Sequence, residues 1–122
     1  MEFTNKRAAI YLQIADYAYD HILTGKWKAG EKIISIRELA IELQVSPNTV
    51  LRAYEYLQQK DVIVNRRGVG YFIDEKAPEK IREIRKKRFF ENDLPEFVKK
   101  VKLLGIDFKM VVKRLNEVNP EK

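Results

Sequence analysis

The sequence predicts a mainly α-helical fold that carries one small β-hairpin. Apolar residues recur every three or four positions along most of the chain, which is the period of a buried stripe on a helix. Ser35 and Ser46 precede two of these stripes as expected N-caps, and Pro47 follows the second serine. A β-branched run at 62–64 leads into a turn with glycines at 68–70, which predicts the hairpin.

The first helix is expected from about Lys6 to Thr24. Gly25 follows as the residue that would end it in the left-handed conformation. Tyr11 is expected to be a packing or surface aromatic rather than a functional group. The apolar residues of this helix recur every four positions, at Ile10, Ile14, Ala18 and Ile22.

Two further helices are expected in close succession. The first is a capped two-turn helix after Ser35, and Gln44 and Val45 then form a connection short enough to force a sharp crossing. In the second helix, the Ser46 hydroxyl can accept from the first-turn N–H groups, and Pro47 loses no hydrogen bond there. Their apolar stripes are Ile36, Leu39, Ala40 and Leu43, and then Val50, Ala53, Tyr54 and Leu57.

The hairpin follows directly. Its β-branched run, turn and aromatic return occupy residues 62–64, 66–70 and 71–73. Gly68 and Gly70 permit positive φ and a close approach of the backbone to a partner. Arg66 and Arg67 would stand at the tip, where they could meet a phosphate or the minor groove.

This order of elements is that of a winged helix-turn-helix and indicates binding to duplex DNA. Taken singly, a charged hairpin tip is usually a solvated turn and a capped helix is usually just a helix, so the joint order carries the prediction. Arg37 is the best candidate for a specific contact, because a guanidinium can pair bidentately with guanine. The residues expected to contact DNA are Ser35, Arg37, Ser46, Pro47, Asn48, Thr49, Arg52, Arg66, Arg67, Gly68 and Gly70.

Residues 10–73 resemble the DNA-binding domain of GntR-type bacterial transcription regulators. The residues that carry the resemblance are Gly25, Gly30, Ser35–Ala40, Val45–Val50, Leu57 and Gly68–Phe72. The segment VSPNTVLRAYEYL and the short tail resemble most the small YtrA-like branch. The chain departs from the family pattern at Ile33–Ser35, which leaves the expected fold unchanged. It also departs at Pro47 and Leu51, so base contacts cannot simply be copied from relatives. The resemblance implies transcriptional repression, relieved by a small-molecule effector or another signal that acts on dimer geometry.

A second helical unit is expected after the hairpin. Residues 74–77 resemble a linker, because Pro78 disfavours the α conformation at Ala77 and can itself start a helix. Pro95 is expected to kink or interrupt that helix near Asn92 to Leu94. Gly105 and Asp107 predict a helix stop and a new N-cap. The sequence thus divides into a DNA-binding domain at 6–74 and a helical dimerisation tail at 75–122.

The apolar stripes of the tail predict a homodimer. Two amphipathic helices cannot bury both stripes completely against each other, so a two-fold interface would cover the remainder. The alternative is a helical pair that folds back on the DNA-binding domain of the same chain. The basic stretch from Lys80 to Arg88 is expected to be a solvated helix face, the alternative being contact with flanking DNA. The candidate interface anchors are Phe89, Phe90, Phe97, Val101, Phe108 and Val112.

Composition agrees with an intracellular DNA-binding protein of one small domain and an appendage. The net charge is +6, but residues 1–74 carry ten basic and nine acidic side chains, whereas 75–122 carry fourteen and nine. DNA binding must therefore depend on where individual cations point. The absence of Cys fits a reducing cytoplasm. No stretch approaches the length of a membrane span, although a basic amphipathic tail on a membrane surface is an alternative.

An enzyme is not expected. The sequence shows no paired carboxylates framed by special turns, no Ser-His-Asp set and no phosphate loop. It shows no metal cluster either, since it has no cysteine and its one histidine cannot build a metal site alone. No cofactor is therefore expected, and no segment resembles a preformed effector pocket. The remaining alternative to a sequence-specific regulator is a winged-helix module that contacts proteins, or nucleic acid without sequence preference.

Overall fold

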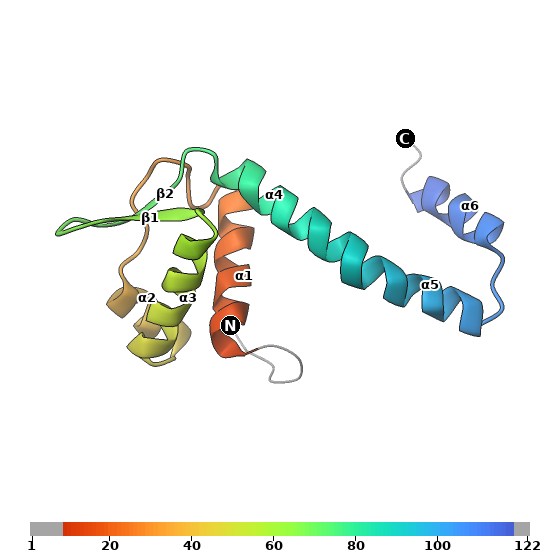
Figure 1. Cartoon of the computed structure of the whole chain (residues 1–122), viewed down its shortest axis with the longest axis horizontal. Coiled ribbons are helices and arrows are strands. Elements are labelled where there is room, and N and C mark those ends of the chain that lie inside the picture. The colour runs from red at the N-terminus through yellow and green to blue at the C-terminus, as the bar shows by residue number, and fades with distance from the viewer. Residues whose placement is uncertain (1–8, 119–122) are drawn as a thin grey trace. The chain divides into compact units, whose positions relative to one another are not determined.

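The computed structural model describes residues 9–118 (Figure 1). Its elements are α1 (Ile10–Leu23), α2 (Ile36–Leu43), α3 (Pro47–Gln59), β1 (Ile63–Arg66), β2 (Gly70–Ile73), α4 (Ala77–Arg88), the π-helical segment η1 (Phe89–Asp93), α5 (Leu94–Leu103) and α6 (Phe108–Val118). The predicted mainly α-helical fold with one small hairpin is confirmed. The expected start of the first helix at Lys6 lies outside the described residues. By its internal contacts, the chain divides into two units between Glu83 and Ile84.

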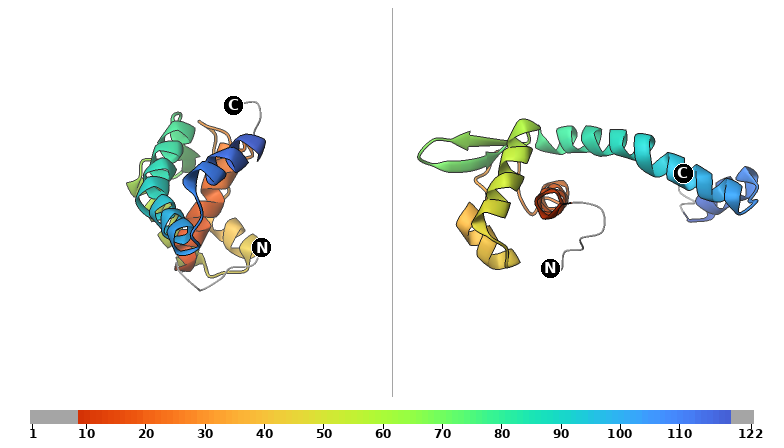
Figure 2. Two further views of the ribbon diagram at one scale, coloured as in Figure 1. Left: turned by 90° about the vertical axis from the view of Figure 1, so that its right-hand side faces the viewer. Right: turned by 60° about the horizontal axis from the view of Figure 1, so that its bottom comes forward.

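The core of the first unit forms where α3 packs against both α1 and α2 (Figures 1 and 2). The apolar stripes predicted for these helices are the ones that are buried. Each fully buried aliphatic or aromatic side chain contributes about 1.5 to 3 kcal/mol relative to an exposed one, so this cluster holds the three helices together. Its completely covered side chains include Ile14, Ala18, Leu39, Val50, Ala53, Tyr54 and Leu57.

The ends of α2 and α3 are fixed by the serines that the sequence indicated. The Ser35 hydroxyl accepts from the Glu38 backbone N–H at 3.1 Å, and the Glu38 carboxylate accepts from Ser35 in return. Gln44 ends α2 in the left-handed region at φ 58°, which turns the chain sharply. The Ser46 hydroxyl then accepts from the Thr49 N–H at 3.2 Å, with Pro47 as the first helical residue. The opening of α3 is therefore held in a defined direction relative to α2.

The hairpin is antiparallel, with Ile63 opposite Ile73 and Arg66 opposite Gly70. The segment before α2 pairs with the other edge of β2, a contact that no local sequence pattern indicates. The Gly30 N–H donates to the Ile73 carbonyl at 2.8 Å, and the Ile33 N–H donates to the Tyr71 carbonyl at 2.9 Å. The right view of Figure 2 shows the hairpin joined to the helices at its open end. The hairpin is thus supported from both sides at its base, and its tip extends beyond this support.

Residues 74–77 form a tight turn rather than the expected linker. The Asp74 N–H donates to the Val62 carbonyl, and the Asp74 carboxylate accepts from the Lys76 N–H, both at 2.9 Å. Ala77 begins α4 and is fully buried, as is Ile81 one turn later. The restriction that a proline places on the preceding residue was outweighed here by the burial of Ala77 and by this capping turn. The first turns of α4 accordingly belong to the first unit.

In the second unit, the interruption expected at Pro95 takes the form of a π-helical segment. The Leu94 N–H donates to the Phe89 carbonyl, five residues back, so the wider turn precedes the residue that lacks an N–H. The predicted stop at Gly105 has φ 67°, and the Ile106 N–H donates back to the Val101 carbonyl at 3.0 Å. Asp107 accepts from the Lys109 N–H at 2.9 Å before α6. Within residues 9–118, no helix is both long enough and apolar enough to cross a membrane.

Candidate nucleic-acid interface

The N-terminal end of α3 presents its polar side chains outward. Asn48 and Arg52 are exposed, and Thr49 is half-buried. The Ser46 hydroxyl is committed to the cap and also lies 2.8 Å from the Thr49 hydroxyl oxygen. The first-turn N–H groups and the positive end of the helix dipole favour a negatively charged group at this position. The predicted recognition residues therefore stand on an exposed helix end that suits a phosphate backbone or base edges.

Arg52 is held by an aromatic ring from another helix. Its guanidinium carbon lies 4.2 Å from the centroid of the Tyr11 ring, which α1 contributes. This is the geometry of a cation–π contact. Sequence reasoning assigned Tyr11 only to packing or the surface, because no local pattern connects two residues that lie so far apart in the chain.

Arg37 stands at the second position of α2 and is exposed. The structure gives its guanidinium no ion pair or aromatic contact among residues 9–118. Ser35, two residues earlier, is exposed, but its hydroxyl is engaged with Glu38 at 2.9 Å as part of the N-terminal cap. The donor groups of Arg37 are therefore more available to a partner than the Ser35 hydroxyl is. The main role of Ser35 is to start α2.

The hairpin of β1 and β2 is the wing of the fold, and its tip places two predicted arginines and one unpredicted lysine together. Arg66 lies with its guanidinium carbon 4.2 Å from the Phe72 ring centroid, and Arg67 is exposed. A Cβ added to Gly70 would lie 2.8 Å from Cε of Lys32, so the lysine stem crosses the backbone at this glycine. Lys32 could have been noticed only by knowing that its segment pairs with β2.

The turn itself requires Gly68. The Val69 N–H donates to the Arg66 carbonyl at 2.9 Å, and Gly68 has φ 78° between them. No other atom would lie within 4 Å of a Cβ at this position, so the requirement is conformational rather than steric. The glycines thus set the course of the tip and leave its cations at the surface.

Two titratable groups of the first unit show how the interface is supported. The Tyr54 hydroxyl donates to the Ile34 carbonyl at 2.7 Å and so ties α3 to the segment before α2. Burial raises the pKa of this hydroxyl well above its ordinary value. The Lys76 backbone N–H, helped by the ion pair with Lys80 at 3.1 Å, lowers the pKa of Asp74. Neither group lies among the predicted DNA contacts.

The six predicted interface anchors all belong to the second unit but differ in exposure. Val101 is 3% exposed and so is already covered by its own chain. The Phe89 and Phe90 rings lie edge to face, with centroids 5.2 Å apart. The five anchors that remain 46–62% exposed are Phe89, Phe90, Phe97, Phe108 and Val112.

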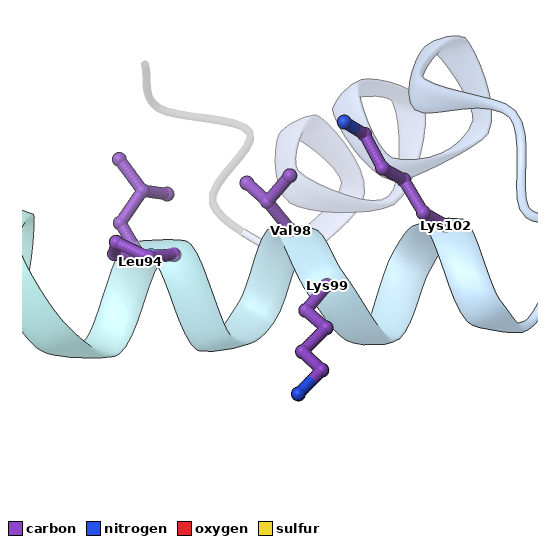
Figure 3. Close-up of a pocket in the computed structure, with 5 residues that line it drawn as sticks. Leu94, Val98, Lys99 and Lys102 are labelled. Atoms are coloured by element: carbon purple, nitrogen blue, oxygen red, sulfur yellow. The ribbon is translucent and has the colours of Figure 1, made fainter.

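One shallow hollow lies along α5. It has a volume of about 490 Å³ and is lined by Leu94, Pro95, Val98, Lys99 and Lys102. Figure 3 shows Leu94, Val98 and Lys102 along one side of the helix, with Lys99 directed away from them. Among residues 9–118, no group of three or more acidic, His or Cys side chains is arranged to hold a metal ion.

Comparison with known proteins places this geometry in a family. Residues 10–73 match the family described as "Bacterial regulatory proteins, gntR family". YhcF of Bacillus subtilis, an HTH-type transcriptional regulator, is 41% identical over 97 residues, which are 80% of this chain and 78% of YhcF. The HTH-type transcriptional repressor YtrA of the same species is 30% identical over 92% of this chain and 85% of its own length.

A solved structure agrees over nearly the whole chain. A protein from Bacteroides thetaiotaomicron, described as a transcriptional regulator of the GntR family, has 40% sequence identity and a TM-score of 0.80. The match covers 93% of this chain and 98% of that one. The family is described as one of regulatory proteins, and both Bacillus subtilis relatives are HTH-type transcriptional regulators. The winged helix-turn-helix and the resemblance inferred from the sequence are thereby confirmed: the chain belongs to the GntR family of bacterial regulatory proteins and is a DNA-binding transcription regulator with YtrA-like relatives.

Proposed function

We propose that this chain represses transcription as a homodimer that recognises a specific, pseudo-palindromic operator. The observation that carries the proposal is the exposed polar end of α3, with Asn48 and Arg52 outward and Arg37 exposed on the preceding helix. Repression is supported by YtrA, a relative that is named a repressor and matches over most of both chains.

The roles of the individual residues follow from their chemistry. Arg37 pairs with a guanine edge and Asn48 with an adenine edge, since these side chains offer the matching donor and acceptor pairs. Arg52 contacts a phosphate or a base. The other groups at the helix ends and the wing tip position the protein on the sugar-phosphate backbone and in the minor groove. They are Ser35, Ser46, Pro47, Thr49, Arg66, Arg67, Gly68 and Gly70.

In the proposed dimer, one part of each chain binds DNA and the other part forms the dimer interface. Residues 6–74 bind DNA. The tail at 75–122, whose first turns belong to the first unit, pairs two copies through its exposed aromatic side chains. Two DNA-binding domains related by a two-fold axis would read half-sites about 10 bp apart, or a multiple of that spacing. A small-molecule effector or another signal would relieve repression by changing this separation. Such a regulator acts in the cytoplasm, where bacterial DNA lies.

Selection of bound duplexes from a random pool tests this proposal. It would be carried out at one stated salt concentration with the wild type, Arg37→Ala and Asn48→Ala. We expect the wild type to enrich a two-fold symmetric motif and each variant to relax one position in each half-site, at a cost of about 1 to 3 kcal/mol. Enrichment of no motif by the wild type would instead indicate a module that binds without sequence preference. An unchanged motif in both variants would show that the reading surface is assigned wrongly.

A further inference from the structure

A ladder of cations and aromatic rings runs along the junction of α1 and α3. The Arg52 guanidinium carbon lies 4.2 Å from the Tyr11 ring centroid. The Tyr11 and Tyr56 rings meet edge to face, with centroids 6.2 Å apart. The Lys60 ammonium nitrogen lies 5.5 Å from the Tyr56 ring centroid. Both tyrosines are half-buried, whereas both cations are exposed.

The ladder restricts the Arg52 side chain without using its hydrogen bonds. When a guanidinium stacks flat on a ring, its N–H donors remain at the edge, and the 4.2 Å distance from the Arg52 guanidinium carbon to the Tyr11 centroid is compatible with this arrangement. Among residues 9–118, the structure gives the Arg52 guanidinium no carboxylate or carbonyl partner. The ring that holds it is itself restrained, because Tyr11 is half-buried and packs against the Tyr56 ring. The donors of Arg52 are therefore available, while the conformation of its long side chain is restricted.

An arginine that is ordered before binding loses less conformational entropy when it meets DNA. The same arrangement recurs on the wing, where Arg66 lies 4.2 Å from the Phe72 ring centroid. Two of the four arginines predicted to contact DNA are thus each held over an aromatic ring from a neighbouring element or strand.

We propose that Tyr11 is a positioning residue for DNA recognition: its ring holds the Arg52 guanidinium so that the N–H edge is presented to the phosphate backbone or a base. The inference rests on the proposed function and assigns a DNA-recognition role to α1, which carries none of the predicted DNA contacts. Tyr11 acts through Arg52 alone and contributes no contact of its own.

A double-mutant cycle on the full chain tests the proposal. The probe is the duplex that the wild type selects, and the variants are Tyr11→Leu, Arg52→Ala and the pair together. Tyr11→Leu is expected to weaken binding about three- to tenfold, the range that a partly exposed cation–π contact provides. In the Arg52→Ala background, the same change is expected to leave affinity unaltered. Tyr11→Phe, which keeps the ring, is expected to bind like the wild type.

Tyr17→Leu is the control for removal of a half-buried tyrosine ring from α1, because the Tyr17 ring contacts His21 and Trp27 instead of an arginine. The Tyr17 hydroxyl also donates to the Glu42 carboxylate at 3.1 Å, so Tyr17→Phe is included to measure the loss of that hydrogen bond separately. Thermal unfolding of every variant separates loss of fold from loss of binding. Equal weakening by Tyr11→Leu with and without Arg52, or unchanged binding in Tyr11→Leu, overturns the positioning role and leaves the proposed function intact. A wild type that selects no duplex overturns both.

Discussion

At the scale of single residues, Tyr54 connects three parts of the first unit. It projects from α3, its hydroxyl donates to the Ile34 carbonyl at 2.7 Å, and its ring meets Tyr71 of β2 at a centroid distance of 5.0 Å. The side chain has no exposed surface. Because this hydroxyl links α3 to the segment that precedes α2, its loss should lower the stability of the α2–α3 pair.

Tyr54→Phe is therefore expected to lower the free energy of unfolding by about 1 to 2 kcal/mol, since it leaves the Ile34 carbonyl without its buried donor. Urea denaturation followed by circular dichroism measures this change. Tyr71→Phe is the control, because within residues 9–118 the structure gives the Tyr71 hydroxyl no hydrogen bond. A loss in Tyr71→Phe as large as that in Tyr54→Phe would contradict the assignment.

The difference in unfolding free energy between the wild type and Tyr54→Phe is expected to depend on pH. Burial raises the pKa of Tyr54 in the folded state above the value of about 10 expected in the unfolded chain. The stabilising effect of the neutral hydroxyl is therefore fully present below about pH 10 and is lost as the pH rises toward the folded-state value. Between about pH 9 and 11, the wild type should lose more stability than Tyr54→Phe, in the same denaturation assay.

At the scale of elements, the wing depends on a glycine for its conformation more than for space. Gly70 has φ 135°, a backbone conformation that residues other than glycine rarely adopt. A Cβ there would also meet Lys32 Cε at 2.8 Å, but that atom lies near the end of a flexible side chain and can move. The backbone strain should therefore dominate the effect of a substitution.

Gly70→Ala is expected to cost about 1 to 3 kcal/mol of stability, and to weaken DNA binding by displacing the wing. The cost should persist in the Lys32→Ala background, where the neighbouring side chain is gone. Gly68→Ala, at φ 78° with open space around it, should cost about 1 kcal/mol. Full recovery of stability in the Gly70→Ala, Lys32→Ala double variant would show that crowding, and not φ, is the cause.

The sequence predicted those elements whose ends are set by local chemistry. Ser46 and Pro47 define the start of α3 through groups within one turn of each other, and Gly105 defines the end of α5 in the same way. The pairing of Gly30 and Ile33 with β2 could not be predicted, because it depends on segments that only the fold brings together. The stacking of Arg52 on Tyr11 was missed for the same reason.

In the predicted site, too, some features follow from local sequence and others depend on the fold. Exposure of Asn48 and Arg52 followed from the helical period, since both lie off the buried stripe of α3. The commitment of the Ser35 and Ser46 hydroxyls to helix caps also follows from local chemistry, and it limits what either can offer to DNA. Lys32 carries no local signal, and only its position across Gly70 places it in the wing.

At the scale of the whole molecule, the exposed apolar side chains of the tail favour a dimer. Phe97 is 46% exposed on α5 and Phe90 is 62% exposed on η1, although both are large aromatics. Leu103 on α5 is 76% exposed but lies off the apolar stripe of that helix, which consists of Leu94, Phe97, Val98, Val101 and Leu104. A substitution at Phe97 therefore tests the proposed interface, and the same substitution at Leu103 controls for the loss of an exposed apolar side chain.

Phe97→Glu is expected to raise the dimer dissociation constant about 30-fold or more, because buried aromatic anchors typically contribute 2 kcal/mol or more to an interface. Sedimentation equilibrium measures the change as a shift toward the 14.4 kDa mass of one chain. Operator affinity should fall by a larger factor than half-site affinity, because two linked DNA-binding domains bind with high effective concentration. Leu103→Glu should leave both measurements near the wild-type values. If instead Phe97→Glu lowers the melting temperature of a chain that is already monomeric, the tail packs within its own chain and the homodimer proposal fails.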